Sequence, residues 1–158
     1  MSSARFLALG DSYTIGEQVD AGARWPVQLA AMLRAGGTRV DDPEIIATTG
    51  WTTDELAAGI ARASPVGPYA LVSLLIGVNN QYRGRQLATY DAEYRALLAQ
   101  AIEFAGGVAG RVIVLSIPDW GVTAFAEGRD RTAVAREIDA FNAAARMATL
   151  AAGARWKP

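Results

Sequence analysis

The sequence predicts a three-layer α/β/α fold built on a flavodoxin-like parallel sheet of four to five strands, in the order 2-1-3-4-5. Three observations lead to this prediction. Short apolar runs alternate with longer amphipathic stretches, as in repeated βαβ units. The run at 69–76 is apolar on both faces, which is typical of a central parallel strand. The run at 6–9 lies close to the N-terminus and ends in a polar turn, which is typical of the first strand of such a sheet.

The composition indicates one domain and excludes several classes of protein. The chain has 158 residues, of which 51% are hydrophobic and 20% charged, with a net charge of −1. No basic face of a nucleic-acid binder is present, and the absence of cysteine excludes disulfides and thiolate metal sites. No apolar run is long enough for a membrane span, and residues 1–5 leave no room for a signal peptide. We therefore expect a cytoplasmic protein with neither metal nor cofactor.

The first helix is expected to begin at Trp25-Pro26, because proline fits the first turn of a helix. It should end at Gly36-Gly37. Four apolar side chains predict its buried face: Trp25, Leu29, Met32 and Leu33.

A weaker strand follows at 44–48, and Thr52 and Glu55 then have the spacing of a capping box, which predicts the start of the next helix. Leu56 and Ile60 give this helix a short apolar stripe.

The second half continues the alternation of strands and helices. After the strand at 69–76 we expect a polar loop at 81–86 and then a long helix. The apolar side of that helix is predicted from Leu87, Tyr90, Tyr94, Leu97, Leu98, Ala101 and Ala105. A strand at 111–117 leads into a long loop and a last helix, whose buried stripe is predicted from Val134, Ile138, Phe141, Ala145 and Ala148. Residues 153–156 have the pattern of a further strand at its start.

Three of the predicted strands end in polar or glycine-containing tips. These tips are Gly10-Asp11-Ser12, Thr48-Thr49-Gly50-Trp51 and Gly77-Val78-Asn79-Asn80. Each tip alone is explained equally well as an ordinary turn, because glycine, asparagine, aspartate and serine are common turn residues. In an open α/β sheet, however, ligands bind outside the carboxyl ends of the strands. We therefore expect the three tips to converge on one small molecule.

Serine, glycine and asparagine at strand ends, in this chain order, resemble the SGNH hydrolases, also called the GDSL esterase/lipase family. The first tip matches the first family motif, with Tyr13 where the family name has leucine. Gly50 matches the lone glycine of the second motif. The third tip matches Gly-x-Asn-Asp, with Asn80 in place of the aspartate. The resemblance covers nearly the whole chain.

The resemblance implies a serine esterase that acts on small acyl esters. Ser12 would be the nucleophile, and its own N–H, the N–H of Gly50 and the amide of Asn79 would form the oxyanion hole. Asp11 and Asn80 would support the site, with Asp11 chiefly structural. The expected walls of the acyl pocket are Tyr13, Trp51, Tyr82 and Trp120, although aromatic residues at these positions are equally common in a core.

The fourth family motif, Asp-x-x-His, has no match, because the chain contains no histidine. In the family this histidine is the general base. Asp119 is the nearest candidate by topology, but an ordinary carboxylate is a weak base toward a hydroxyl. Three explanations stay open: a fragment or frameshifted product of an enzyme whose tail carried the Asp and His, a tail supplied by another chain, or a member that binds without catalysis.

The ending at 154–158 favours the first explanation, since it has the pattern of a strand being entered. We therefore expect one SGNH-hydrolase-like domain, 1–158, truncated at its C-terminus and weakly active or inactive. We also expect a homodimer through the surface left by the missing helix, bordered by the first strand, Leu29 and Phe141.

A flavodoxin-like binding module is the alternative from another class. The loop Ser12-Tyr13-Thr14-Ile15-Gly16 superficially resembles a phosphate-cradling turn. This loop has only one glycine at each end, and no flavin-stacking pattern accompanies it. A receiver-like domain is disfavoured, because Asp11 ends the first strand but no acid ends the third.

Overall fold

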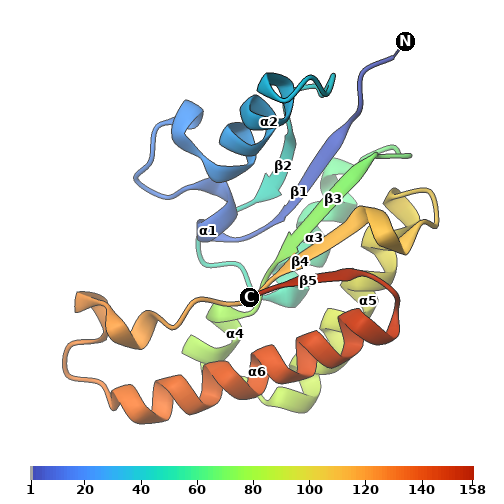
Figure 1. Ribbon diagram of the computed structural model, residues 1–158. Coiled ribbons are helices and arrows are strands. Elements are labelled where there is room, and N and C mark those ends of the chain that lie inside the picture. Colours follow the sequence, from blue (N-terminus) through green and yellow to red (C-terminus); the bar gives the residue numbers. More distant parts are fainter. Residues whose placement is uncertain (1) are drawn as a thin grey trace.

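The structure, a computed structural model, describes residues 2–158 and confirms the predicted sheet. Five strands lie in the order β2-β1-β3-β4-β5, and each neighbouring pair is parallel (Figure 1). The strands are β1 (Phe6–Gly10), β2 (Glu44–Ala47), β3 (Leu71–Leu75), β4 (Val112–Leu115) and β5 (Arg155–Lys157). The carboxyl ends of all five strands therefore meet along one edge of the sheet.

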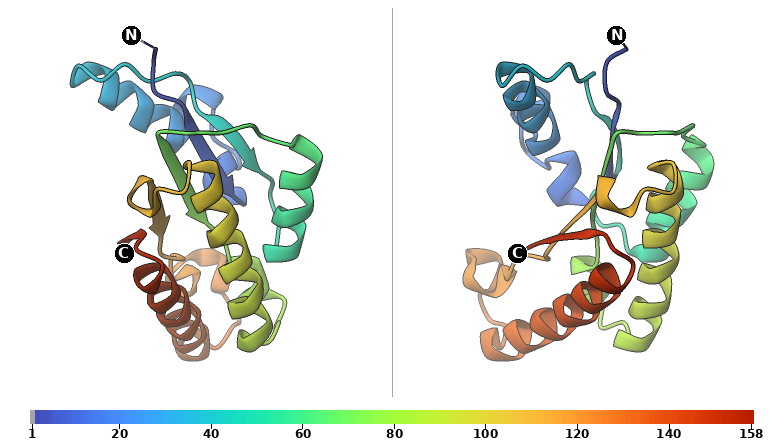
Figure 2. Two further views of the ribbon diagram at one scale, coloured as in Figure 1. Left: turned by 90° about the vertical axis from the view of Figure 1, so that its right-hand side faces the viewer. Right: turned by 45° about the vertical axis from the view of Figure 1, so that its right-hand side comes forward.

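Helices cover both faces of the sheet, as predicted, but unequally. Helix α2 lies on one face, and α3, α5 and α6 lie on the other (Figures 1 and 2). The α-helices are α1 (Ser12–Ile15), α2 (Trp25–Ala35), α3 (Thr53–Ala63), α4 (Val78–Tyr82), α5 (Leu87–Phe104) and α6 (Arg131–Ala151). Short 3-10 turns occupy η1 (Ala21–Ala23), η2 (Ala109–Arg111), η3 (Trp120–Val122) and η4 (Ala124–Ala126). Within residues 2–158 no helix combines the length and the apolarity needed to cross a membrane.

Strand β1 is buried on both faces and separates two clusters of apolar side chains. Leu7 and Leu9 belong to the large core beneath α3, α5 and α6. Phe6 and Ala8 belong to the smaller cluster beneath α2. This alternation follows from the two-residue period of a strand, and it explains why the first run of the sequence is continuously apolar.

The predicted helix faces are confirmed with two exceptions. The stripes of α5 and α6 are buried as expected, from Tyr90 to Ala101 and from Val134 to Ala148. The prediction that Met32 is buried is wrong, because its side chain is 71% exposed. The buried face of α2 centres on Pro26 and Ala30, and Met32 lies outside that face. Leu87 is also exposed, since it is the first residue of α5.

Part of the sheet on the α2 side is not covered by any helix of residues 2–158. Ile113 and Leu115 of β4 point to this side, because they alternate with valines that lie in the large core, and both are half-buried. Phe141 does not border this surface, contrary to the expectation. Its ring packs on Tyr90 across the large core, with ring centroids 4.6 Å apart.

Candidate active site

Strand β1 ends in a tight turn that places Ser12 at the first position of α1. Asp11 caps this helix, because its Oδ1 accepts a 3.0 Å hydrogen bond from the N–H of Tyr13. Gly10 is required before the cap, since a Cβ atom there would lie 2.7 Å from the carbonyl oxygen of Leu75. Neither the hydroxyl nor the N–H of Ser12 bonds to another part of residues 2–158, so both can contact a ligand.

The second tip is a four-residue turn at the end of β2. The N–H of Trp51 donates to the carbonyl oxygen of Thr48 over 3.3 Å. Gly50 has a φ of +87°, a left-handed value that glycine adopts without strain. Its own N–H has no hydrogen-bond partner in the described part of the chain. The turn therefore leaves an unpaired backbone donor at the edge of the sheet.

Asn79 lies in the first turn of α4, directly after β3. Gly77 begins this turn with a φ of +132°, and a Cβ atom there would lie 2.7 Å from side-chain atoms of Ile117 and Tyr90. The Nδ2 of Asn79 donates to the carbonyl oxygen of Trp51 over 2.9 Å. An amide nitrogen carries two hydrogens, so this bond orients the side chain and leaves one donor for a ligand.

The three tips meet at one cavity of about 430 Å³. Its wall is formed by Ser12, Tyr13, Glu17, Thr49, Gly50, Val78, Asn79, Tyr82, Trp120, Thr123 and Phe125. The structure thus brings Ser12, Gly50 and Asn79 to the wall of one cavity. Three residues of the wall were not predicted, namely the acidic Glu17, Thr123 and the exposed Phe125.

Three aromatic rings form one side of this cavity. The centroid of Tyr82 lies 5.5 Å from that of Trp120 and 5.8 Å from that of Phe125, and the last two lie 5.8 Å apart. The indole N–H of Trp120 donates to Gln81 Oε1 over 2.7 Å, which satisfies the buried end of this ring. The guanidinium of Arg129 lies over Tyr82, 5.0 Å from its centroid.

Trp51 lies outside the cavity wall, contrary to the prediction. Its ring lies against α3, where a Cβ atom added to Gly59 would come within 2.2 Å of the indole. The part of Trp51 that faces the site is its carbonyl oxygen, which holds Asn79. The missing side chain of Gly59 leaves room for this ring, and no local motif of the sequence indicates that contact.

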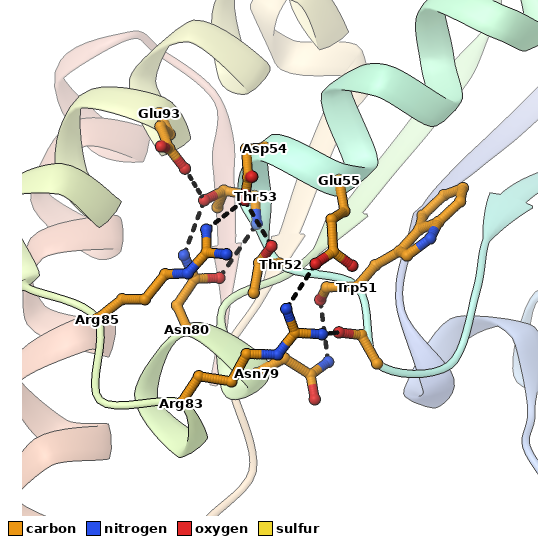
Figure 3. A network of polar contacts seen from close by, with 11 residues as sticks. Trp51, Thr52, Thr53, Asp54, Glu55, Asn79, Asn80, Arg83, Arg85 and Glu93 are labelled. Carbon is orange, nitrogen blue, oxygen red and sulfur yellow. Dashed lines mark hydrogen bonds and ion pairs between the residues drawn. The ribbon is translucent and has the colours of Figure 1, made fainter.

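Asn80 is buried and joins α4 to the start of α3 (Figure 3). Its Oδ1 accepts from the N–H of Thr53 over 3.1 Å, and its Nδ2 donates to the hydroxyl of Thr53 over 2.8 Å. The predicted capping box is not formed, because the hydroxyl of Thr52 donates to Asp54 and makes no cap bond. Asn80, which follows β3, therefore supplies the cap that the spacing of Thr52 and Glu55 predicted.

Asp11 is fully buried beneath the Ser12 turn, and its Oδ2 has no hydrogen-bond partner in the described chain. Burial raises the pKa of this carboxyl from the usual 3.8 to about 7, although the hydrogen bond from the N–H of Tyr13 lowers it. Asp11 therefore supports the turn and is largely protonated below neutral pH.

Two further carboxylates lie near the site, and neither combines burial with a place in the cavity wall. Asp119, the candidate from the sequence, uses its Oδ1 to accept from the N–H of Gly121 over 2.8 Å and does not line the cavity. Glu17 lines the cavity but is exposed to water. Among residues 2–158, no three acidic side chains come together in a group that could hold a metal ion.

Comparison with known families decides the relationship of the chain. The model of the GDSL-like lipase/acylhydrolase family matches residues 8–157. The chain belongs to this family. Its members are hydrolases of the esterase or lipase type, so the coarse class of the protein follows from the match. No curated protein sequence matches the chain.

Solved structures with the same fold agree with GDSL-like membership. AlinE4, described as a SGNH-hydrolase family esterase, superposes with a TM-score of 0.78 at 18% identity, over 99% of this chain and 76% of that chain. TesA superposes with a TM-score of 0.70 at 20% identity, over 96% of this chain and 76% of TesA. Phospholipase A1 from Streptomyces albidoflavus NA297 superposes with a TM-score of 0.64 at 20% identity, over 99% of this chain and 80% of the phospholipase. Likeness at these identities supports the fold, and not the substrate.

Proposed function

We propose that this chain is a serine esterase-type hydrolase of small acyl esters that works through an acyl-enzyme at Ser12. The observation that supports the proposal is the shared cavity wall, in which the Ser12 hydroxyl lies with Gly50 and Asn79. The size of the cavity, about 430 Å³, and its aromatic side favour a small apolar acyl group.

In the proposed reaction the Oγ of Ser12 attacks the carbonyl carbon of the ester, and the carbonyl oxygen becomes negatively charged. The N–H groups of Ser12 and Gly50 and the amide of Asn79 would donate to this oxygen. Donors that are already oriented stabilise such charge without reorganisation, which is often the largest single contribution to catalysis. The Ser12 proton passes to solvent and the bond between the carbonyl carbon and the leaving oxygen breaks, which releases the alkoxide. Water then attacks the acyl carbon, the bond to Oγ breaks, and the carboxylate leaves as the Ser12 hydroxyl is restored.

The proton of the Ser12 hydroxyl needs a base, and the chain has no histidine to accept it. Serine hydrolases stripped of triad members retain roughly 10³- to 10⁴-fold acceleration over water through their oxyanion donors and substrate binding. We therefore expect weak activity on activated esters, whose leaving groups need little proton transfer. The chain would then bear a complete oxyanion site and an incomplete triad.

Ser12→Ala is expected to abolish the residual hydrolysis of p-nitrophenyl acetate, and Asn79→Ala to reduce it by about 100-fold or more, the usual effect of losing one oxyanion donor. Mass spectrometry should find the acetyl group on Ser12 in the unmodified chain, because hydrolysis of the acyl-enzyme also needs a base. An unchanged rate in Ser12→Ala would exclude this serine as the nucleophile. Turnover of the unmodified chain at about 1–1000 per second would instead reveal an unrecognised base.

A non-catalytic GDSL-like protein is the second candidate, and the missing histidine favours it. Such a protein would bind an ester or its acid in the same cavity without acquiring an acetyl group on Ser12. The flavodoxin-like module gains no support from the family match. A yellow colour in the purified protein would indicate a bound flavin and so favour the flavodoxin-like module.

We further propose that two copies of the chain associate through the uncovered sheet surface at Ile113 and Leu115. Exposed apolar patches favour association, and these side chains are half-buried on the side of β4 that the helices of residues 2–158 leave uncovered (Figure 2). Light scattering is expected to give the mass of a dimer, and Leu115→Lys to shift it toward a monomer.

Met147→Lys is the matched control for self-association, because Met147 is 69% exposed on the outer surface of α6. This substitution should leave the mass unchanged. A monomeric mass for the unmodified chain, together with high thermal stability, would contradict self-association.

A further inference from the structure

The turn that carries Gly50 is held from outside by two side chains of α4 and its C-terminal cap, Asn79 and Arg83. The Nη2 of Arg83 donates to the carbonyl oxygen of Gly50 over 2.6 Å, and Asn79 donates to the carbonyl oxygen of Trp51. The two contacts fix successive carbonyl groups of one turn (Figure 3). Arg83 itself does not line the cavity, so it acts on the site only through the backbone.

A second contact fixes the direction of the Arg83 guanidinium. Its Nη1 forms a 2.5 Å ion pair with Oε1 of Glu55, in the first turn of α3. A planar guanidinium held at two nitrogens presents its donors in one geometry only. Glu55 therefore aims Arg83 at the Gly50 carbonyl, and the spacing of Glu55 after the turn serves this contact and not a capping box.

Glycine loses the most conformational freedom on folding, so a turn with glycine at a φ of +87° needs outside contacts to keep one conformation. We propose that Arg83 is a positioning residue of the acyl site: by holding the Gly50 carbonyl it keeps the turn, and with it the unpaired N–H of Gly50, in one orientation at the cavity wall. The catalytic part of this inference rests on the proposed function, because an oriented N–H matters most where an oxyanion forms.

A matched control pair lies beside the Arg83–Glu55 pair. Arg85 forms an ion pair with Asp54, the residue before Glu55, and so joins the same two segments of chain. The two arginines are similarly exposed, 41% for Arg83 and 32% for Arg85. Arg85 makes no contact with the Gly50 turn in the described chain. Loss of either pair should therefore change thermal stability to a similar and small extent.

The order of Gly50 can be measured without turnover. Gly50 is the one glycine in the sequence that follows a threonine, so a chain labelled with ¹³C-carbonyl threonine and ¹⁵N glycine gives a single correlated amide signal. Arg83→Met is expected to lower the heteronuclear NOE of this signal and to broaden it. Arg85→Met should leave both unchanged. Glu55→Gln should give an intermediate effect, because the amide keeps an acceptor but loses the charge.

The catalytic consequence is measured on p-nitrophenyl acetate. Arg83→Met is expected to lower kcat about 10-fold with an unchanged KM, less than the ~100-fold cost of a lost donor. In Arg83→Ala, added guanidinium chloride at low concentration should restore part of the rate, whereas sodium chloride should not. Arg85→Met should keep the rate of the unmodified chain.

The inference is overturned if the Gly50 amide is as mobile in the unmodified chain as in Arg83→Met. It is also overturned if Arg83→Met and Arg85→Met change the Gly50 signal and the rate to the same extent. If Arg83→Met fails to fold, Arg83→Lys and Glu55→Gln decide in its place by the same signal. Failure of the proposed function shows separately, as a rate that Ser12→Ala does not change.

Discussion

Extension of the chain by a segment that carries Asp-x-x-His is expected to raise the rate of p-nitrophenyl acetate hydrolysis by several powers of ten. A positioned base alone contributes roughly 10²- to 10⁴-fold. The gain should exceed that of a base acting alone, because in a triad the base activates a serine whose oxyanion donors are already in place. The rate is compared in one assay for the 158-residue chain, the extended chain and its Ser12→Ala variant.

The direction of β5 supports this expectation. Arg155–Lys157 runs parallel to β4, so a segment attached after Pro158 starts at the carboxyl edge of the sheet, where Ser12, Gly50 and Asn79 also lie. A short connection can therefore bring a histidine toward the cavity without crossing the sheet.

The control for the extended chain replaces the histidine by alanine and keeps the aspartate. This variant should show the stability of the extended chain and the weak rate of the 158-residue chain. An equal rate with and without the histidine would mean that the limit on activity lies elsewhere, for example in the conformation of the Gly50 turn.

Most of the fold was predictable because each long element carries its own pattern. Val134, Ile138 and Phe141 recur at the spacing of one helix face, and they are buried in α6 as predicted. The run of β3 could be assigned to the centre of the sheet because it is apolar on both faces, as in a parallel strand covered on both sides. Helices α1 and α4 were not predicted, since four or five residues are too few to show a helical period.

The candidate site was predictable only at the level of its strand ends. Parallel topology brings Ser12, Gly50 and Asn79 to one edge, and local motifs identify each of them. The supporting contacts were not accessible in this way. Asn80 caps α3 from 27 positions away, and the contact of Arg83 with Gly50 spans 33 positions. Such pairs depend on how two loops meet, which no local pattern encodes.

Asp11→Asn is expected to remove most of the pH dependence of stability between about pH 4 and pH 7. The folded chain holds the Asp11 proton with a pKa of about 7, against 3.8 for the ordinary carboxyl. A raised pKa of an acid means that the protonated form favours folding. Its contribution is fully present below pH 3.8 and is lost as the pH rises toward 7.

The magnitude of this effect is large for one side chain. The difference between 3.8 and about 7 corresponds to up to about 4 kcal/mol in the free energy of unfolding. The physical cause is the cost of a buried charge: Asp11 Oδ2 and the nearby Thr14 Oγ1 are both buried without a hydrogen-bond partner in the described chain. An ionised carboxylate there receives one N–H bond, from Tyr13, and little solvent.

No side chain of a type that ordinarily titrates near neutral pH is present, which simplifies the measurement. The chain has no histidine and no cysteine. Burial raises the pKa of Tyr13 from 10.0, so this group ionises at higher pH. The hydrogen bond from Thr52 lowers the pKa of Asp54 from 3.8, so this group ionises at lower pH. A slope between pH 4 and pH 7 is therefore expected to report chiefly on Asp11.

The measurement is urea unfolding followed by tryptophan fluorescence at several pH values from 4 to 8. The unmodified chain should lose stability as the pH rises, while Asp11→Asn, whose amide oxygen can still accept from the N–H of Tyr13, should stay nearly constant. Asp119→Asn is the matched control, because Asp119 accepts from the N–H two residues later but is only half-buried. This control should keep the slope of the unmodified chain. Parallel slopes for Asp11→Asn and the unmodified chain would show that Asp11 ionises in the folded state as easily as in water, and the turn that presents Ser12 would then have to open to solvent.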